Sequence, residues 1–115
     1  MIKKSFALLP LVLALTAFKT PAVPAAPVSD PTIPTEVQAL LDKYSCTSCH
    51  AMSRRLVGPM WTAVAAKGYS AKRIVQLVKV PEPANWPGYS PMAAQPTVPK
   101  ADLQKIANWL AGLKK

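Results

Sequence analysis

The sequence predicts an all-α domain of roughly three to five short helices. Between residues 35 and 115 apolar side chains recur at helical spacing, and no segment alternates apolar and polar residues as a half-buried strand would. The chain has thirteen prolines, and most lie in two stretches, residues 21–34 and 80–100, which interrupt the helices. A domain this small buries too little surface to be comfortably stable alone, so we expect a bound group to complete its core.

The first helix is expected to begin near Thr35, and a short second helix to cover residues 60–67 and end at Gly68. The first helix has apolar residues at positions i, i+3, i+4 and i+7, which is the stripe of an amphipathic helix. These residues are Val37, Leu40, Leu41 and Tyr44.

The third helix is expected to follow Ser70, whose hydroxyl can cap it, and the last to begin near Pro99 and end near Gly112. In the third helix we expect Lys72, Arg73 and Lys79 to face solvent. The two apolar faces are Ile74, Leu77 and Val78 in the third helix, and Leu103, Ile106, Ala107 and Leu110 in the last.

The run Cys46-Thr47-Ser48-Cys49-His50 contains the only two cysteines and the only histidine of the chain. Thiols at this spacing can add to the two vinyl groups of a haem, and the next residue then lies under the iron. The motif predicts one covalent haem c, with Cys46 and Cys49 as thioether donors and His50 as an iron ligand. The alternatives are a disulfide, a redox pair and half of a zinc site. A redox pair belongs in a βαβ pattern, and a closed zinc site needs more ligands than these three.

The second proline-rich stretch, residues 80–100, is long for a loop in a compact domain unless it holds a functional group. An electron-transfer haem takes a second strong iron ligand, and with no second histidine a methionine thioether is the expected donor. Met92 is the candidate, because Met52 follows His50 too closely and Met60 would have to cross the haem edge within ten residues. Prolines would stiffen the loop and reduce the entropy lost on ligation. The alternative role for Met92 is filling a gap in the core.

Residues 1–25 are expected to be a secretory signal peptide, cleaved somewhere between residues 22 and 26. Lys3 and Lys4 precede an apolar stretch, residues 5–18, that is short for a membrane span. An uncleaved membrane anchor is the alternative. Export to the periplasm agrees with the haem prediction, because thioether formation occupies both cysteines of an exported protein.

After cleavage we expect a proline-rich leader, residues 26–34, a monohaem domain, residues 35–115, and no stable membrane insertion. Loss of Lys3, Lys4 and Lys19 leaves eleven basic and five acidic side chains, a formal charge of +6. In an exported protein this charge favours an acidic protein partner over nucleic acid.

Over residues 35–115 the chain resembles the small bacterial class I c-type cytochromes. The resemblance depends on the Cys-x-x-Cys-His motif, on the residues 56–59 and 86–92, and on a closing helix that contains Trp109. It implies the cytochrome c fold, in which short helices wrap around one haem.

The resemblance also implies roles for individual residues. The Pro59 carbonyl would accept a hydrogen bond from His50 Nδ1 and leave Nε2 for iron. The Trp86 indole would lie beside a haem propionate, unless it is only a packed aromatic ring. Tyr44 and Trp109 would pack where the first and last helices cross. Arg54 and Arg55 depart from the family pattern: they could steady propionates, dock a partner or face solvent, and for either one alone we expect solvent.

The expected function is that of a periplasmic one-electron carrier and not of an enzyme, because two axial ligands keep substrate and oxygen from the iron. It would pass electrons from a dehydrogenase or reductase complex to a terminal acceptor, as a monomer or in a small complex. Lys43, Arg54 and Lys72 are candidates for attracting an acidic redox partner. The alternatives are a dedicated cytochrome subunit of a periplasmic oxidoreductase and a gas-binding or peroxidase-like haem protein.

Overall fold

Four short α-helices and two 3₁₀ turns make up the regular structure of the residues that can be described. The computed structural model describes residues 17–22 and 33–113, and this part contains no strand and no helix long and apolar enough to cross a membrane. The all-α prediction is confirmed. The predicted signal peptide and leader lie largely outside the described residues. In chain order the elements are α1 (Thr35–Lys43), η1 (Cys46–Ser48), α2 (Trp61–Ala66), α3 (Ala71–Lys79), η2 (Pro83–Asn85) and α4 (Lys100–Gly112).

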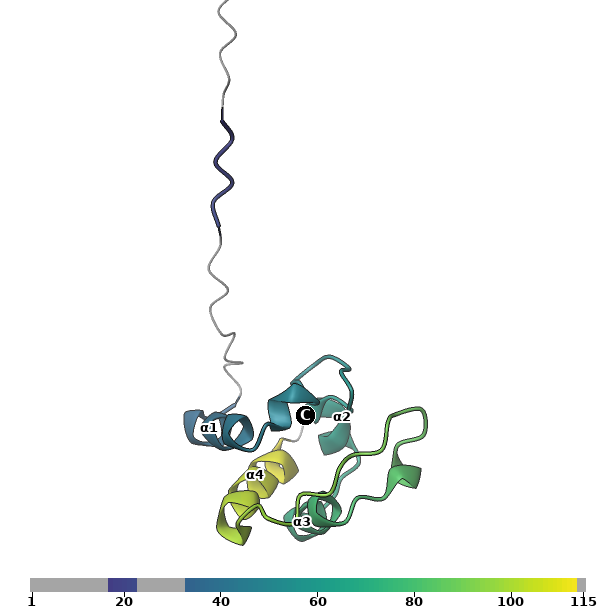
Figure 1. The fold of residues 1–115 in the computed structure, drawn as a ribbon. Coiled ribbons are helices and arrows are strands. Elements are labelled where there is room, and N and C mark those ends of the chain that lie inside the picture. Colours follow the sequence, from purple (N-terminus) through teal and green to yellow (C-terminus); the bar gives the residue numbers. More distant parts are fainter. Residues whose placement is uncertain (1–16, 23–32, 114–115) are drawn as a thin grey trace, which may run out of the picture.

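Helix α4 packs against the other three helices, and in Figure 1 it lies between α1 and α3. The apolar stripe of α1 faces this centre, because Val37 and Leu41 are buried while Leu40 and Tyr44 are half-buried. The predicted apolar face of α4 is confirmed, since all four of its residues are buried: Leu103, Ile106, Ala107 and Leu110.

The predicted boundaries of α2 and α3 are also confirmed. Gly68 follows α2 with φ of +71°, a left-handed conformation that is easy for glycine. The Ser70 hydroxyl accepts a hydrogen bond from the Arg73 amide at 3.1 Å and so caps α3. Lys72 is exposed, and Arg73 and Lys79 are half-exposed, so all three remain accessible to solvent. Arg73 forms a 2.6 Å ion pair with Glu82, at the start of the following loop.

The segment between α3 and α4, green in Figure 1, swings away from α3 and then returns to the start of α4. It contains η2, and its return is fixed by Val98, whose side chain is buried. This path brings the second proline-rich stretch back across the domain, so its residues can face elements far away in the sequence.

A polar cluster joins α1 to α4 at the surface. The Tyr44 hydroxyl donates a 2.5 Å hydrogen bond to the Asp102 carboxylate, and the Lys43 ammonium lies 3.4 Å from the same group. Tyr44 thus reaches the last helix, as the resemblance implied. Mainly through the Tyr44 hydroxyl, and despite partial burial, the pKa of Asp102 is held below its ordinary value. A second ion pair between these helices joins Lys105 and Glu36.

We expect Asp102→Asn to lower stability at neutral pH but not in acid. A carboxyl whose pKa is depressed by folding stabilises the protein above its unfolded pKa of about 3.9, and this contribution is lost as the pH falls through the folded value. The measurement is the urea midpoint, followed by far-UV circular dichroism, at pH 7 and near pH 3. Glu36→Gln is the matched control and should cost less at pH 7, because Glu36 lacks a tyrosine partner. A deficit of Asp102→Asn that is the same at both pH values would contradict this account.

Candidate functional site

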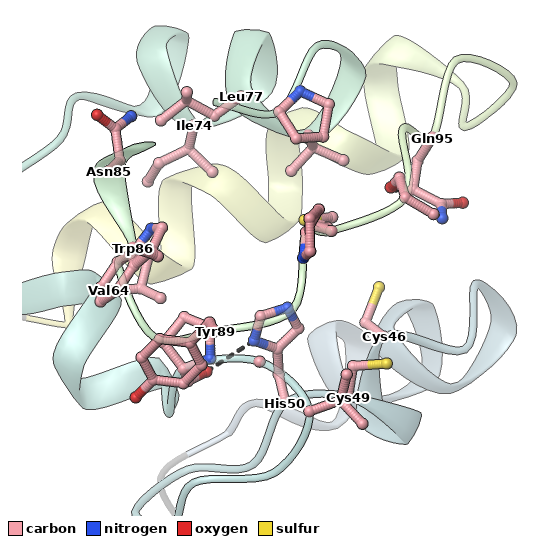
Figure 2. Close-up of a pocket in the computed structure, with 18 of the residues that line it drawn as sticks. Cys46, Cys49, His50, Val64, Ile74, Leu77, Asn85, Trp86, Tyr89 and Gln95 are labelled. Carbon is pink, nitrogen blue, oxygen red and sulfur yellow. Dashed lines mark hydrogen bonds between the residues drawn. The ribbon is translucent and has the colours of Figure 1, made fainter. Parts of the chain in front are cut away.

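A cavity of about 350 Å³ lies among the helices and the α3–α4 segment. Its walls are mostly apolar, and Figure 2 shows Cys46, Cys49 and His50 on one side with Ile74 and Leu77 on the opposite side. The structure brings all the site residues predicted from the sequence to this one cavity. They are Cys46, Cys49, His50, Pro59, Trp86 and Met92.

The 3₁₀ turn η1 positions the two cysteines and the histidine. Ser45, just before it, is in the left-handed conformation, and the amides of Cys49 and His50 both donate to the Cys46 carbonyl, at 3.2 and 3.0 Å. The turn therefore directs three side chains toward one cavity over five residues of chain. Both thiols are free and half-buried, and burial raises the pKa of the Cys46 thiol.

The His50 ring is buried and held in one orientation. Its Nδ1 lies 2.7 Å from the Pro59 carbonyl oxygen, and the Trp61 ring stacks on it with the centroids 4.4 Å apart. A carbonyl only accepts, so Nδ1 must carry the proton and Nε2 is left with its lone pair. Burial lowers the pKa of His50 more than the Pro59 carbonyl raises it, which favours the neutral ring. The site therefore presents a neutral imidazole nitrogen of the kind that binds metals.

Gly58 makes this orientation possible, and the sequence analysis missed its role. The Gly58 amide donates to the Cys49 carbonyl at 2.8 Å, which brings its backbone against the histidine. A Cβ on Gly58 would lie 2.5 Å from His50 Cε1 and 2.9 Å from Nδ1, closer than real contacts allow. The stack of Trp61 on His50 was missed as well. The only signals in the sequence were a glycine directly before Pro59 and an aromatic residue two positions after it.

The methionines of the described residues have different environments. Met92 lines the cavity and is 41% exposed. Met52 is buried in the helical core, and Met60 precedes α2 and is half-buried outside the cavity lining. Met92 is therefore the methionine that shares the cavity with His50.

Arg55 is exposed, as predicted, but it also has partners that the sequence did not reveal. The central carbon of its guanidinium lies 3.9 Å from the centre of the Tyr89 ring, and the guanidinium donates to the Gly88 carbonyl. The hydrogen bond from Arg55 to Gly88 spans 33 residues of sequence, so no local pattern could reveal it. Arg54 is exposed, as predicted.

Curated proteins similar to this chain share one name. The chain is 36% identical over 78 residues to cytochrome c-551 of Allochromatium vinosum, an alignment that covers 64% of this chain and 82% of the relative. It is 31% identical over 81 residues to cytochrome c-551 of Pseudomonas denitrificans, covering 67% of this chain and 96% of the relative. The chain belongs to the small bacterial class I c-type cytochromes. A third cytochrome c-551, from Azotobacter vinelandii, is 36% identical over 77 residues and is covered over 92% of its length. No protein-family model matches the cytochrome.

As a c-type cytochrome the protein carries one covalent haem c and serves electron transport. The site fits this group: two free thiols and an oriented histidine face a largely apolar cavity, and Gly58 leaves room for the histidine ring. Within residues 17–22 and 33–113 no three His, Cys, Asp or Glu side chains are grouped to hold a metal ion.

We expect Gly58→Ala to destabilise the cytochrome, because its Cβ must displace the His50 ring or the loop that carries Pro59. Overpacking of a close-packed site typically costs about 1–3 kcal/mol. The measurement is the free energy of urea unfolding of the haem-loaded protein, together with its visible spectrum. Gly112→Ala is the matched control, since nothing lies within 4 Å of a Cβ there. Equal stability of the two variants would show that the histidine and its loop can move apart freely.

Proposed function

We propose that this cytochrome is a periplasmic one-electron carrier whose iron is ligated by His50 and Met92, with Cys46 and Cys49 as the thioether donors. The observation that carries the proposal is the cavity that His50 and Met92 share and that Met52 and Met60 do not line. A thioether is the expected partner of a histidine in cytochromes c and raises the reduction potential. With His50 and Met92 both holding the iron, the chain would leave no iron position for a substrate, which favours a carrier role over catalysis.

The residues around the haem site would each have a distinct role. Haem c bound in the cavity supplies a one-electron iron couple. The Pro59 carbonyl and the Trp61 ring keep His50 in one tautomer and one orientation, so that Nε2 is presented without reorganisation. The apolar walls keep water away from this site. Little of the chain then has to move when an electron arrives or leaves.

Trp86 is the candidate for contact with a haem propionate. Its ring lines the cavity and meets Tyr89 edge-on, with the centroids 5.9 Å apart. The indole N–H makes no hydrogen bond within the described part of the chain, so it is free to donate. Trp86 would thus pack its ring against the haem and donate its indole N–H to a propionate.

The redox partners proposed for this cytochrome are proteins with acidic docking surfaces, a dehydrogenase or reductase complex as donor and a terminal acceptor. The chain has fourteen basic and five acidic side chains. All three candidate steering residues are exposed, but Lys43 already pairs with Asp102, whereas Arg54 and Lys72 have no ion pair within the described residues. Arg54 and Lys72 are therefore the stronger candidates for attracting a negatively charged partner.

The test of the ligand assignment is Met92→Ala. The ferric protein with Met92 should show the weak near-infrared band of methionine-ligated haem, and the variant should lose it completely, have a lower reduction potential and bind carbon monoxide when reduced. Met60→Ala removes the same side chain outside the cavity and should leave all three readings unchanged. Persistence of the band in Met92→Ala would reject the assignment. Carbon monoxide binding to the unaltered protein at neutral pH would favour the gas-binding alternative.

The steering residues are tested by the salt dependence of electron transfer from ferrocyanide, an anionic donor. The rate should fall as salt screens the attraction, with a Debye length of about 8 Å at physiological ionic strength. Arg54→Gln and Lys72→Gln should flatten this dependence, whereas the charge-conserving Arg54→Lys should not. An unchanged slope in both glutamine variants would place the attractive charge elsewhere.

A further inference from the structure

Two basic side chains and two aromatic rings form a continuous row beside the cavity. Arg55 lies over the Tyr89 ring at 3.9 Å, Tyr89 meets Trp86 edge-on at 5.9 Å, and the Lys67 ammonium lies 4.7 Å from the Trp86 ring centre. The order is cation, ring, ring, cation. Each cation faces the electron-rich surface of a ring, which is the favourable geometry for cation–π attraction. We call these four residues the aromatic clamp.

Each cation of the aromatic clamp also bonds to the backbone of the same segment. Arg55 donates to the Gly88 carbonyl, and Lys67 donates to the Asn85 carbonyl at 3.0 Å. Arg55 comes from the loop after the haem motif, whereas Lys67 comes from the end of α2. Residues 85–89 are therefore held from two separate parts of the domain. Each of the two cations contacts one aromatic ring and one backbone carbonyl of these residues.

The α3–α4 segment has few other attachments to the rest of the domain. Near its start, the Glu82 carboxylate accepts hydrogen bonds from Arg73 at 2.6 Å and from Asn85 at 3.1 Å. Its return is fixed by the Gln95 amide, which donates to the Val78 carbonyl at 3.0 Å. Residues 86–94 also bond to their close neighbours Pro83 and Gln95, but among the described residues only Arg55 reaches them with a hydrogen bond from outside the α3–α4 segment. The position of Met92 thus depends on the aromatic clamp and on packing.

We infer that Arg55 and Lys67 are positioning residues that hold the loop closed and so keep the Met92 thioether at the iron. This inference rests on the proposed ligation by Met92. Arginine suits the position of Arg55 because a planar guanidinium can stack on a ring while one of its N–H groups reaches a carbonyl. A lysine there keeps the charge but cannot do both. Arg55→Lys therefore separates the positioning role from any general effect of charge on the iron or on partners.

The experiment is a titration of the ferric, haem-loaded protein with imidazole, which competes with methionine for the iron. Imidazole enters only when the loop opens, so its apparent affinity reports the open fraction. For an exposed or partly buried cation–π pair, loss of the contact should tighten imidazole binding about three- to tenfold in Arg55→Lys and in Tyr89→Leu. Tyr89→Phe keeps the ring and should bind imidazole as the unaltered protein does.

Arg54→Ala is the matched control, since it removes an arginine from the neighbouring position, where the side chain is exposed and makes no hydrogen bond or ion pair within the described residues. Its imidazole affinity should be unchanged. The effect of the double variant Arg55→Lys/Tyr89→Leu on imidazole affinity should be smaller than the product of the two single effects, because both substitutions remove the Arg55–Tyr89 contact. A general loss of stability would make the two effects add.

The outcomes separate this inference from the proposed function. If Arg55→Lys keeps the near-infrared methionine band and binds imidazole with unchanged affinity, Met92 remains the ligand and the clamp is rejected. Fully additive effects in the double variant would also reject it. If the unaltered protein shows no methionine band, the ligation and the clamp fall together.

Discussion

The shared wall between the core and the cavity is the constraint on which the rest of the structure depends. Among residues 17–22 and 33–113 ten hydrophobic side chains are buried, and six of them also line the cavity: Trp61, Ile74, Val98, Leu103, Ile106 and Leu110. A small domain has little apolar surface to bury, so it cannot build a core in one place and a cofactor site in another. The group in the cavity and the packing of the helices are therefore parts of a single hydrophobic unit, and a change to one is felt by the other.

The two sides of the cavity are organised by different forces. Around His50 the chain is held mainly by backbone bonds, including those from Gly58 to Cys49 and from Trp61 to Ala51, both 2.8 Å long. Around Met92 the loop has mostly side-chain attachments. Backbone contacts of this kind are set by the path of the chain, whereas side-chain contacts can be strengthened or lost by single substitutions. The position of His50 is thus set by the backbone, whereas single substitutions can strengthen or weaken the attachment of the loop that carries Met92.

Sequence reasoning succeeded where the signal is local. The periodicity of α1 and α4, the Ser70 cap and the haem motif each need only a few neighbouring residues, and the structure contains all of them. It failed where the partner is distant, as with Arg55 and Tyr89, or where the function of a residue is to have no side chain, as with Gly58. It also did not reveal the ion pair of Arg73, because the Glu82 that pairs with it lies beyond the end of the helix. Such contacts depend on how the loops return to the domain, which periodicity does not specify.

The basic side chains of this cytochrome therefore fall into two groups, which the amino-acid composition does not distinguish. One group makes contacts within the domain, and the other is exposed and free to attract a partner. Arg55 and Lys67 face aromatic rings and backbone carbonyls of one loop, and Lys43 and Lys105 pair with carboxylates across α1 and α4. Arg54 and Lys72 have no such partners within the described residues. Salt weakens contacts between groups that touch less than it weakens the attraction between an exposed charge and a partner more than a Debye length away. Loop closure and partner attraction should therefore respond differently to ionic strength, although both depend on lysine and arginine.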